Sequence, residues 1–233
     1  MALLAPSQLP PAIPAEALLA EFAVYGRFYA RRIADVPEQL RDRLEIAPRA
    51  WPLIDCIERE PDVLVIMMNP GASRPLAALW DGAGDGGQDG FVATQPDRTQ
   101  YQIMQLLLLA QAQGKGWRHA RVLNLSDLRT PKSRVFIEKL AAYAGDDSHS
   151  LFSSVRRAEC LRLFATPATP VVCAWGLSPH FAPLAQLALA AAKAHPLLGL
   201  TADGVLYRHP LPQRFDLQRQ WLADMQQQLG RLK

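Results

Sequence analysis

Polar or turn-forming residues stand directly after four apolar segments of this chain. Asn69 follows the first segment, Asn124 ends the second, Gly176 ends the third and His209 follows the fourth. An amide oxygen can hold a water molecule, and an imidazole can donate a hydrogen bond to developing negative charge. Because an amide cannot take the proton of that water, such a set suits a reaction whose leaving group departs as a stabilised anion.

Asn69 and His209, the two strongest catalytic candidates, also have conformational explanations. Asn69 precedes Pro70 and Gly71, and an asparagine there commonly forms a turn with its own backbone. His209 could instead cap a strand or pack in the core, between Leu206 and the stiff Pro210. We favour the catalytic interpretation for Asn69 because the other segment ends converge with it, and both interpretations stay open for His209.

Other polar residues near these segment ends are weaker candidates. Asp97 could act as a general base from the start of a helix, although helix capping explains it nearly as well. Asn124 presents an amide suited to reading the edge of a base. Ser126 is explained better by capping than by substrate binding, and Trp175 by packing better than by stacking on a base.

Composition limits the classes of function. The 233 residues are 49% hydrophobic and carry a formal charge of +3, an excess too small to indicate nucleic-acid binding by itself. Cys56, Cys160 and Cys173 are far apart and show no zinc or iron–sulfur spacing. Glycine-rich phosphate-binding motifs are also missing, so the sequence predicts neither a metal nor a cofactor.

The start of the chain does not read as a secretory signal. The first residues lack the basic and apolar regions of a secretory signal, and no apolar run is long enough for a membrane span. The sequence therefore predicts a cytoplasmic protein with no membrane partner.

Alternating strand and helix patterns must position these residues. Continuous apolar runs predict buried parallel strands at 63–68, 120–125, 170–176 and 205–208. Helical patterns lie between and after them, at 98–113, 132–143, 150–164, 183–194 and 215–229. In such folds ligands bind beyond the carboxyl ends of the strands. We therefore expect a three-layer α/β/α sandwich with a four-stranded parallel sheet.

The domain layout follows from the same patterns. Residues 1–14 predict a proline-rich lead-in, and 15–233 a single α/β domain. Within it, apolar residues at helical spacing predict a helical extension over 15–60, before a core sheet over 61–213 and a C-terminal helix over 214–230. The segment 81–90, rich in glycine and aspartate, predicts a mobile surface loop.

Five short segments of the chain together resemble the bacterial family known as domain of unknown function 1643. The likeness covers roughly residues 60–213. The segments, in order, are Met68-Asn69-Pro70-Gly71, Asp97-Arg98-Thr99, Val122-Leu123-Asn124-Leu125, Ala174-Trp175-Gly176, and Gly199 to Asp203-Gly204 through Arg208-His209-Pro210-Leu211. That family offers no established activity.

A more distant likeness is to the uracil-DNA glycosylase superfamily. The turn Asn69-Pro70-Gly71, the pair Trp175-Gly176 and the segment His209-Pro210-Leu211-Pro212 are similar to its motifs in order and position. The resemblance implies that Asn69 positions water, that Asn124 reads the base, and that the other matched residues contact substrate. The sequence departs from the pattern at Leu211, where serine is usual, and it lacks the Asp-Pro-Tyr motif of the main uracil glycosylases.

The favoured hypothesis is a hydrolase that cleaves the N-glycosidic bond of a nucleobase in nucleic acid or in a nucleoside. Its partners would be nucleic acid or a nucleotide-like small molecule. One alternative is a binding module for such ligands without catalysis. Another is a protein for an unrelated small metabolite that shares only the fold.

Overall fold

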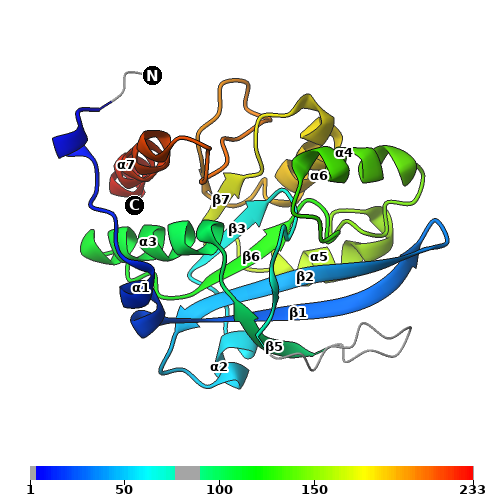
Figure 1. Ribbon diagram of the computed structural model, residues 1–233, viewed down its shortest axis with the longest axis horizontal. Helices are drawn as coiled ribbons and strands as arrows, with labels where there is room; N and C mark the ends of the chain where they lie inside the picture. Colours follow the sequence, from blue (N-terminus) through cyan, green and yellow to red (C-terminus); the bar gives the residue numbers. More distant parts are fainter. Residues whose placement is uncertain (1–3, 77–89, 233) are drawn as a thin grey trace.

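The computed structural model describes residues 4–76 and 90–232, and one eight-stranded sheet runs through it (Figure 1). The spatial order is β4-β5-β1-β2-β6-β3-β7-β8. The strands are β1 (Phe22–Ile33), β2 (Val36–Pro48), β3 (Val63–Met67), β4 (Arg74–Pro75), β5 (Phe91–Gln95), β6 (Ala120–Asn124), β7 (Val171–Ala174) and β8 (Leu197–Leu198).

Helices occupy most of the segments between these strands. The α-helices are α1 (Ala15–Glu21), α2 (Leu53–Glu58), α3 (Arg98–Ala112), α4 (Ser133–Ala142), α5 (Arg157–Leu163), α6 (Ala182–Ala191) and α7 (Phe215–Arg231). Short 3₁₀ turns lie at η1 (Pro6–Gln8), η3 (Ser154–Arg156) and η4 (Pro179–Phe181). The predicted helices after residue 97 are therefore present with shifts of a few residues, except that 150–164 is helical only from Ser154.

The sheet is larger than predicted and mixed in direction, so the expected four-stranded parallel sheet is not confirmed as the whole sheet. β6, β3, β7 and β8 pair in parallel, with Val65 opposite Val122 on one side and Val172 on the other. Every residue of β3, β6 and β7 is buried, as expected for strands covered on both faces. Beyond β6 the sheet continues through four antiparallel-paired strands.

The fourth parallel strand lies earlier in the chain than predicted. It is β8, whereas 205–208 forms only isolated bridges, from Tyr207 to Gly176 and to Thr201. The Asp203 carboxylate accepts hydrogen bonds from the backbone nitrogens of Val205 (2.9 Å) and Leu206 (2.8 Å). This turn uses the donors that a strand would offer to its neighbour, so the segment passes the sheet edge as a loop.

The prediction of a helical extension over 15–60 is wrong. Helix α1 ends at Glu21, and the chain then forms the long antiparallel hairpin of β1 and β2, in which Ile33 pairs with Val36. Ala34 and Asp35 have φ of 44° and 64°, the left-handed conformation of a two-residue hairpin turn. The hairpin also brings residues of this region into the core sheet, because β2 pairs with β6.

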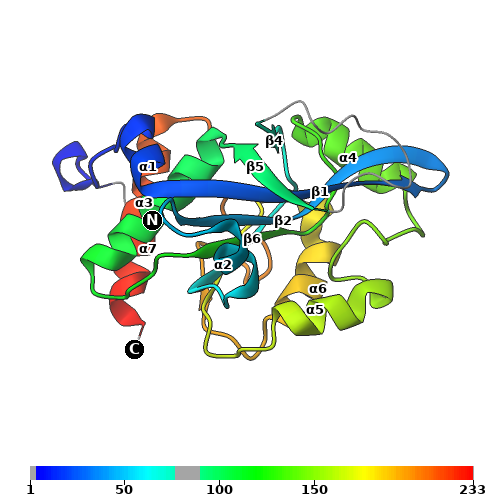
Figure 2. The same cartoon turned by 90° about the horizontal axis from the view of Figure 1, so that it is seen from below.

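Two hydrophobic clusters cover opposite faces of the sheet. One joins α1, α3 and α7 to side chains such as Ile46 and Val65, and the other joins α4, α5 and α6 to side chains such as Leu64 and Ile66. Figure 2 shows the two groups of helices on either side of the strands. The alternation of Leu64, Val65 and Ile66 between clusters is the period of two expected for a strand.

A buried ionic network ties the hairpin to α5 and to the end of β6. The Arg156 guanidinium contacts the carboxylates of Asp127 and Glu159, the latter at 2.9 Å, and lies 3.7 Å from Asp42. Arg27 donates to Asp42 over 2.9 Å. Asp127 is fully buried and follows β6 closely in the chain. The network therefore lies next to the end of that strand.

The proline-rich lead-in, where described, is docked rather than free. Arg219 on α7 donates to the backbone oxygens of Leu9 and Pro10, both at 3.0 Å, and the Ile13 nitrogen donates to Gln105 on α3. The predicted loop 81–90, apart from Gly90, lies outside the described residues. Among the described helices, none is long and apolar enough to cross a membrane.

Candidate functional site

A cleft of about 590 Å³ opens beyond the carboxyl ends of the parallel strands. Its walls come from the end of β3, the loop after β6, the start of α3, the segment after β7 and the segment before α7. Eight of the eleven predicted site residues line it: Asn69, Pro70, Gly71, Asp97, Trp175, Gly176, His209 and Leu211. Asn124, Ser126 and Pro210 do not line it, and all three are buried.

The Asn69 amide is fixed by the loop that follows β6. Its Nδ2 donates to the backbone oxygens of Leu128 (3.1 Å) and Thr130 (2.9 Å). Leu128 is itself bridged to Leu40 on β2, so this loop is anchored to the sheet. Because both amide hydrogens are used, the orientation of Oδ1 is set, and within the described residues no hydrogen bond engages that oxygen. Asn69 therefore offers the cleft an acceptor in a fixed position.

Pro70 and Gly71 make the turn that places Asn69. The Ser73 nitrogen bonds back to the Pro70 oxygen, and Gly71 has φ of +62°, a conformation that favours glycine. A Cβ built on Gly71 would lie 3.9 Å from Oδ2 of Asp97. The turn and the start of α3 are thus direct neighbours across the cleft.

Asp97 caps helix α3 with one carboxylate oxygen. Oδ1 accepts from the nitrogens of Thr99 (2.9 Å) and Gln100 (3.0 Å), and the Gln100 side chain accepts from the Asp97 nitrogen. This capping box confirms the predicted N-cap. Oδ2 makes no hydrogen bond to the described residues, so capping and a role in the cleft use different oxygens.

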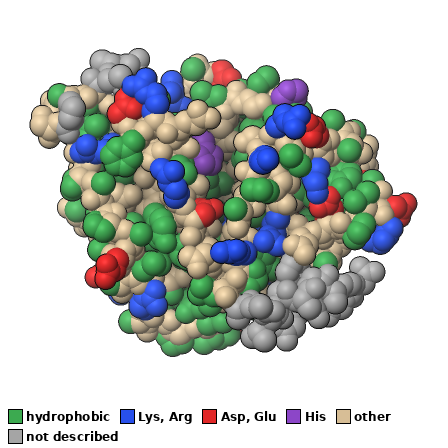
Figure 3. Space-filling model, viewed as in Figure 1, with side chains coloured by type: hydrophobic (Ala, Val, Ile, Leu, Met, Phe, Trp, Pro, Cys, Tyr) green, Lys and Arg blue, Asp and Glu red, His purple; other side chains and the backbone are tan. Residues whose placement is uncertain are grey.

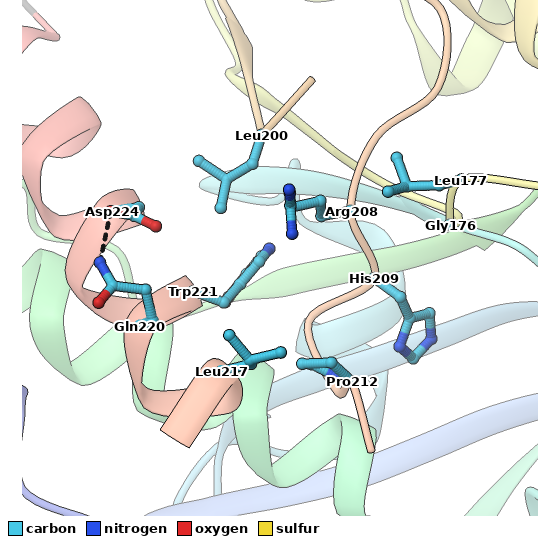
Figure 4. Close-up of a pocket in the computed structure, with 10 residues that line it drawn as sticks. All are labelled: Gly176, Leu177, Leu200, Arg208, His209, Pro212, Leu217, Gln220, Trp221 and Asp224. Atoms are coloured by element: carbon cyan, nitrogen blue, oxygen red, sulfur yellow. Dashed lines mark hydrogen bonds between the residues drawn. The ribbon is translucent and has the colours of Figure 1, made fainter. Parts of the chain in front are cut away.

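His209 is held as a neutral donor. Its Nδ1 accepts from the Leu211 nitrogen over 3.1 Å, so the proton of the neutral ring lies on Nε2. Burial lowers the pKa of His209, and the Asp97 charge opposes that shift. Figure 4 shows the His209 ring directed away from Trp221 and Leu200. Within the described residues no hydrogen bond uses Nε2.

Asn124 and Ser126 support the cleft from behind its surface. Asn124 has no exposed surface, and the amide orientation that satisfies its neighbours donates to the Asn69 backbone oxygen (3.2 Å) and accepts from Nη2 of Arg41 (3.3 Å). Ser126 Oγ accepts from the Leu128 nitrogen. Neither side chain reaches a ligand in the cleft, so the predicted substrate-reading role of Asn124 does not fit this structure.

Trp175 and Gly176 shape the cleft wall without offering an aromatic face. Trp175 is fully buried, donates its indole N–H to the Val205 oxygen (3.1 Å) and packs edge-on against Tyr207 at 5.1 Å. The stacking role considered for Trp175 therefore does not fit, whereas the packing alternative does. Gly176, with φ of +102°, donates to the Tyr207 oxygen and borders the cleft.

Arg41 lines the cleft from β2, although no motif in the sequence indicates it. Its segment was expected to be helical and outside the core, where an arginine would lie on the surface. The observed side chain is only 2% exposed. Assigning 36–48 to a strand is the only step from the sequence that would have directed attention to it.

A second, smaller pocket of about 200 Å³ adjoins the cleft (Figure 4). It lies between α7 and the segment around Arg208, and its walls are mostly apolar. The indole nitrogen of Trp221 and Oδ2 of Asp224 are buried there without hydrogen-bond partners in the described residues. Burial raises the pKa of Asp224. Gly176, Leu177, His209 and Pro212 border both cavities.

The described part of the chain contains no group of three or more histidine, cysteine, aspartate or glutamate side chains placed to hold a metal ion. Lysine and arginine side chains are scattered among hydrophobic and uncharged ones on the face shown in Figure 3. Comparison of the chain with protein-family models, with curated proteins and with solved structures found no match. What the cleft can do therefore follows from its own residues.

Proposed function

We propose that the cleft hydrolyses the N-glycosidic bond of a small nucleoside-type molecule. The observation that carries this proposal is the fixed Asn69 amide. With both hydrogens bound to Leu128 and Thr130, the amide can only accept, and a water molecule is the natural donor to it. Such a water is oriented for attack on a carbon in the cleft.

Asp97 and His209 supply the two remaining needs of this reaction. The water oxygen bonds to the anomeric carbon, and the electron pair of the breaking C–N bond leaves with the base. Oδ2 of Asp97 takes the water proton, while Nε2–H of His209 donates to the base as it gains negative charge. Burial keeps His209 neutral, and its contact with Leu211 keeps the proton on the nitrogen that faces the cleft.

The size and charge of the cleft favour a free nucleoside or nucleotide over a duplex. A cleft of about 590 Å³ is within the range typical of small-molecule sites. Binding duplex nucleic acid and extruding a base requires a basic footprint. The scattered cations of the face in Figure 3 and the net charge of +3 provide little of it.

The fold assignment that accompanies this proposal is a three-layer α/β/α architecture related to the uracil-DNA glycosylases. The parallel pairing of β6, β3 and β7 and the helices packed on both faces support it. The order of Asn69-Pro70-Gly71, Trp175-Gly176 and His209-Pro210 along the strand ends supports it as well. The antiparallel hairpin is an addition to that plan.

The test is release of free base from a panel of nucleosides and their monophosphates, followed by chromatography. Oligonucleotides carrying uracil, hypoxanthine or mismatched thymine form a second arm, with alkali to reveal abasic sites. Asn69→Ala should abolish release, whereas Gln227→Ala, an exposed amide on α7, should leave it unchanged. Binding of these ligands without release by the wild type would favour the alternative of a binding module.

A further inference from the structure

Arg41 reaches the cleft from the antiparallel half of the sheet. The pairing of β1 with β2 shifts register between Arg27 and Phe28, which leaves Asp42 as an extra residue on β2. The Asp42 carboxylate turns to Arg27 and Arg156, away from its neighbour Arg41. A bulge of this kind re-aims the side chains beside it. Here the bulge places Arg41 in the lining of the cleft, while the carboxylate of its neighbour Asp42 contacts Arg27 and Arg156.

Among the described residues, the Arg41 guanidinium has no counter-ion in direct contact. Its Nη2 donates to Asn124, while Nε and Nη1 are buried without a hydrogen-bond partner in the described residues. Within the same residues no carboxylate lies within 4.0 Å of it. Burial lowers the pKa of Arg41 to about 10, and the more distant charges of Asp97, Asp127 and Asp42 only partly offset that effect. The side chain is therefore a buried, still protonated cation with unused donors.

Such an arrangement is costly for the free protein. Removing a charge from water without pairing it destabilises a fold, and a ligand that supplies the missing charge would remove that cost. The start of α4 also favours an anion in the cleft, because Ser133 lines the cleft and no side chain caps the helix. Uncapped helix N-termini attract anions through their free N–H groups.

We propose that Arg41 and the start of α4 form a subsite for a phosphate monoester, so that the ligand of the cleft is a nucleotide rather than a nucleoside. This inference rests on the proposed function for the class of ligand, while the anion subsite itself is testable without catalysis. The guanidinium reaches the anion by turning toward the cleft, which breaks only its 3.3 Å contact with Asn124.

The experiment measures binding by calorimetry and thermal melting, with no readout of turnover. The probes are inorganic phosphate, sodium acetate, nucleosides and the matching 5′-monophosphates. The variants are Arg41→Met, which keeps a similar volume, and Arg162→Met, the same change at an exposed arginine of α5 that does not line the cleft. Both variants lower the net charge by one, so a general charge effect appears in both.

We expect wild type and Arg162→Met to bind monophosphates at least about tenfold more tightly than nucleosides, the ratio that one charge-assisted hydrogen bond provides. Inorganic phosphate should raise their melting temperature more than acetate does. Arg41→Met should lose both effects and melt, without ligand, no lower than wild type. Arg41→Lys, which keeps the charge but not the fork of donors, should retain only part of the preference.

Equal affinity of the wild type for nucleosides and monophosphates would overturn the subsite, as would a phosphate preference that survives in Arg41→Met. The comparison of nucleoside and monophosphate affinities in the wild type tests the subsite even if a variant does not fold. Acetate matching phosphate would overturn the assignment to a phosphate monoester. Tight monophosphate binding without base release would contradict the proposed function and leave the subsite standing.

Discussion

The Asn124 side chain lies beneath Asn69 and donates to its backbone oxygen over 3.2 Å. The two asparagines end neighbouring parallel strands, yet one faces the cleft and the other is fully buried. Asn124 also accepts from Arg41, so it joins the turn of the first strand to the cation of the hairpin. It therefore positions the site rather than touching the ligand.

Asn124→Ala should lower the free energy of unfolding by about 1–3 kcal/mol, because it removes the partner of the Asn69 backbone oxygen and of the buried Arg41 guanidinium. Urea unfolding measures this change. Ligand affinity, measured at a temperature where the variant is folded, should fall much less than in Asn69→Ala. A variant as stable as wild type would contradict the supporting role.

Two substitutions of Asp97 can separate its capping of α3 from its proposed role as the base. Asp97→Asn keeps an oxygen that can accept from Thr99 and Gln100, so stability should change by only a few tenths of a kcal/mol, whereas Asp97→Ala should lose about 1 kcal/mol. Base release should be lost in both variants because neither can take the proton of the water. Unfolding curves and release rates measured together check this, and full activity in Asp97→Asn would exclude Asp97 as the base.

His209 gives the site a predicted dependence on pH. Its pKa is lowered by burial below the ordinary 6.5 of the unfolded chain, so the unfolded state binds more protons as pH falls through 6.5. Wild type should therefore lose stability below that pH relative to His209→Asn, whose Oδ1 can still accept from Leu211 but does not titrate. The difference between the two unfolding curves isolates His209, because His149, also with a lowered pKa, is present in both. An NMR titration midpoint above 6.5 would contradict this.

Arg156 carries the buried network behind the strand ends. Arg156→Met should reduce the free energy of unfolding by about 3–5 kcal/mol, because it leaves the fully buried Asp127 carboxylate without its cation, while Asp42 keeps Arg27. Arg134→Met, which removes the exposed ion pair of Arg134 with Glu138, should change the free energy of unfolding by no more than about 0.5 kcal/mol. Equal effects of the two substitutions in urea unfolding would show that the network contributes little.

The strand ends were accessible from the sequence because local signals agree there. The run 63–67 is apolar throughout and stops at Asn69-Pro70-Gly71, so both the strand and its turn follow from residue type. The capping of α3 by Asp97 follows from the same kind of local pattern. These signals sufficed to bring most of the cleft residues together.

The hairpin was missed because two periods compete in 18–28. Leu18, Phe22 and Tyr25 recur at helical spacing, but Phe22, Val24 and Phe28 also fit alternate positions of a strand. Tertiary pairing of β2 with β6 decides between them, and no local pattern reports it. The burial of the Asn124 side chain behind the cleft could not be predicted from the sequence either, because it depends on the contact with Arg41 from that hairpin.

Because β2 pairs with β6, the hairpin covers a strand that would otherwise lie at the edge of the parallel part of the sheet. Without residues 22–48, β6 would expose the row of backbone donors and acceptors that Leu44 and Ile46 now cover. An unpaired strand of that kind, whose residues are all buried in the intact sheet, is a template for another chain. A shortened chain starting near residue 60 would keep every strand-end residue of the cleft, and we expect it to self-associate through β6.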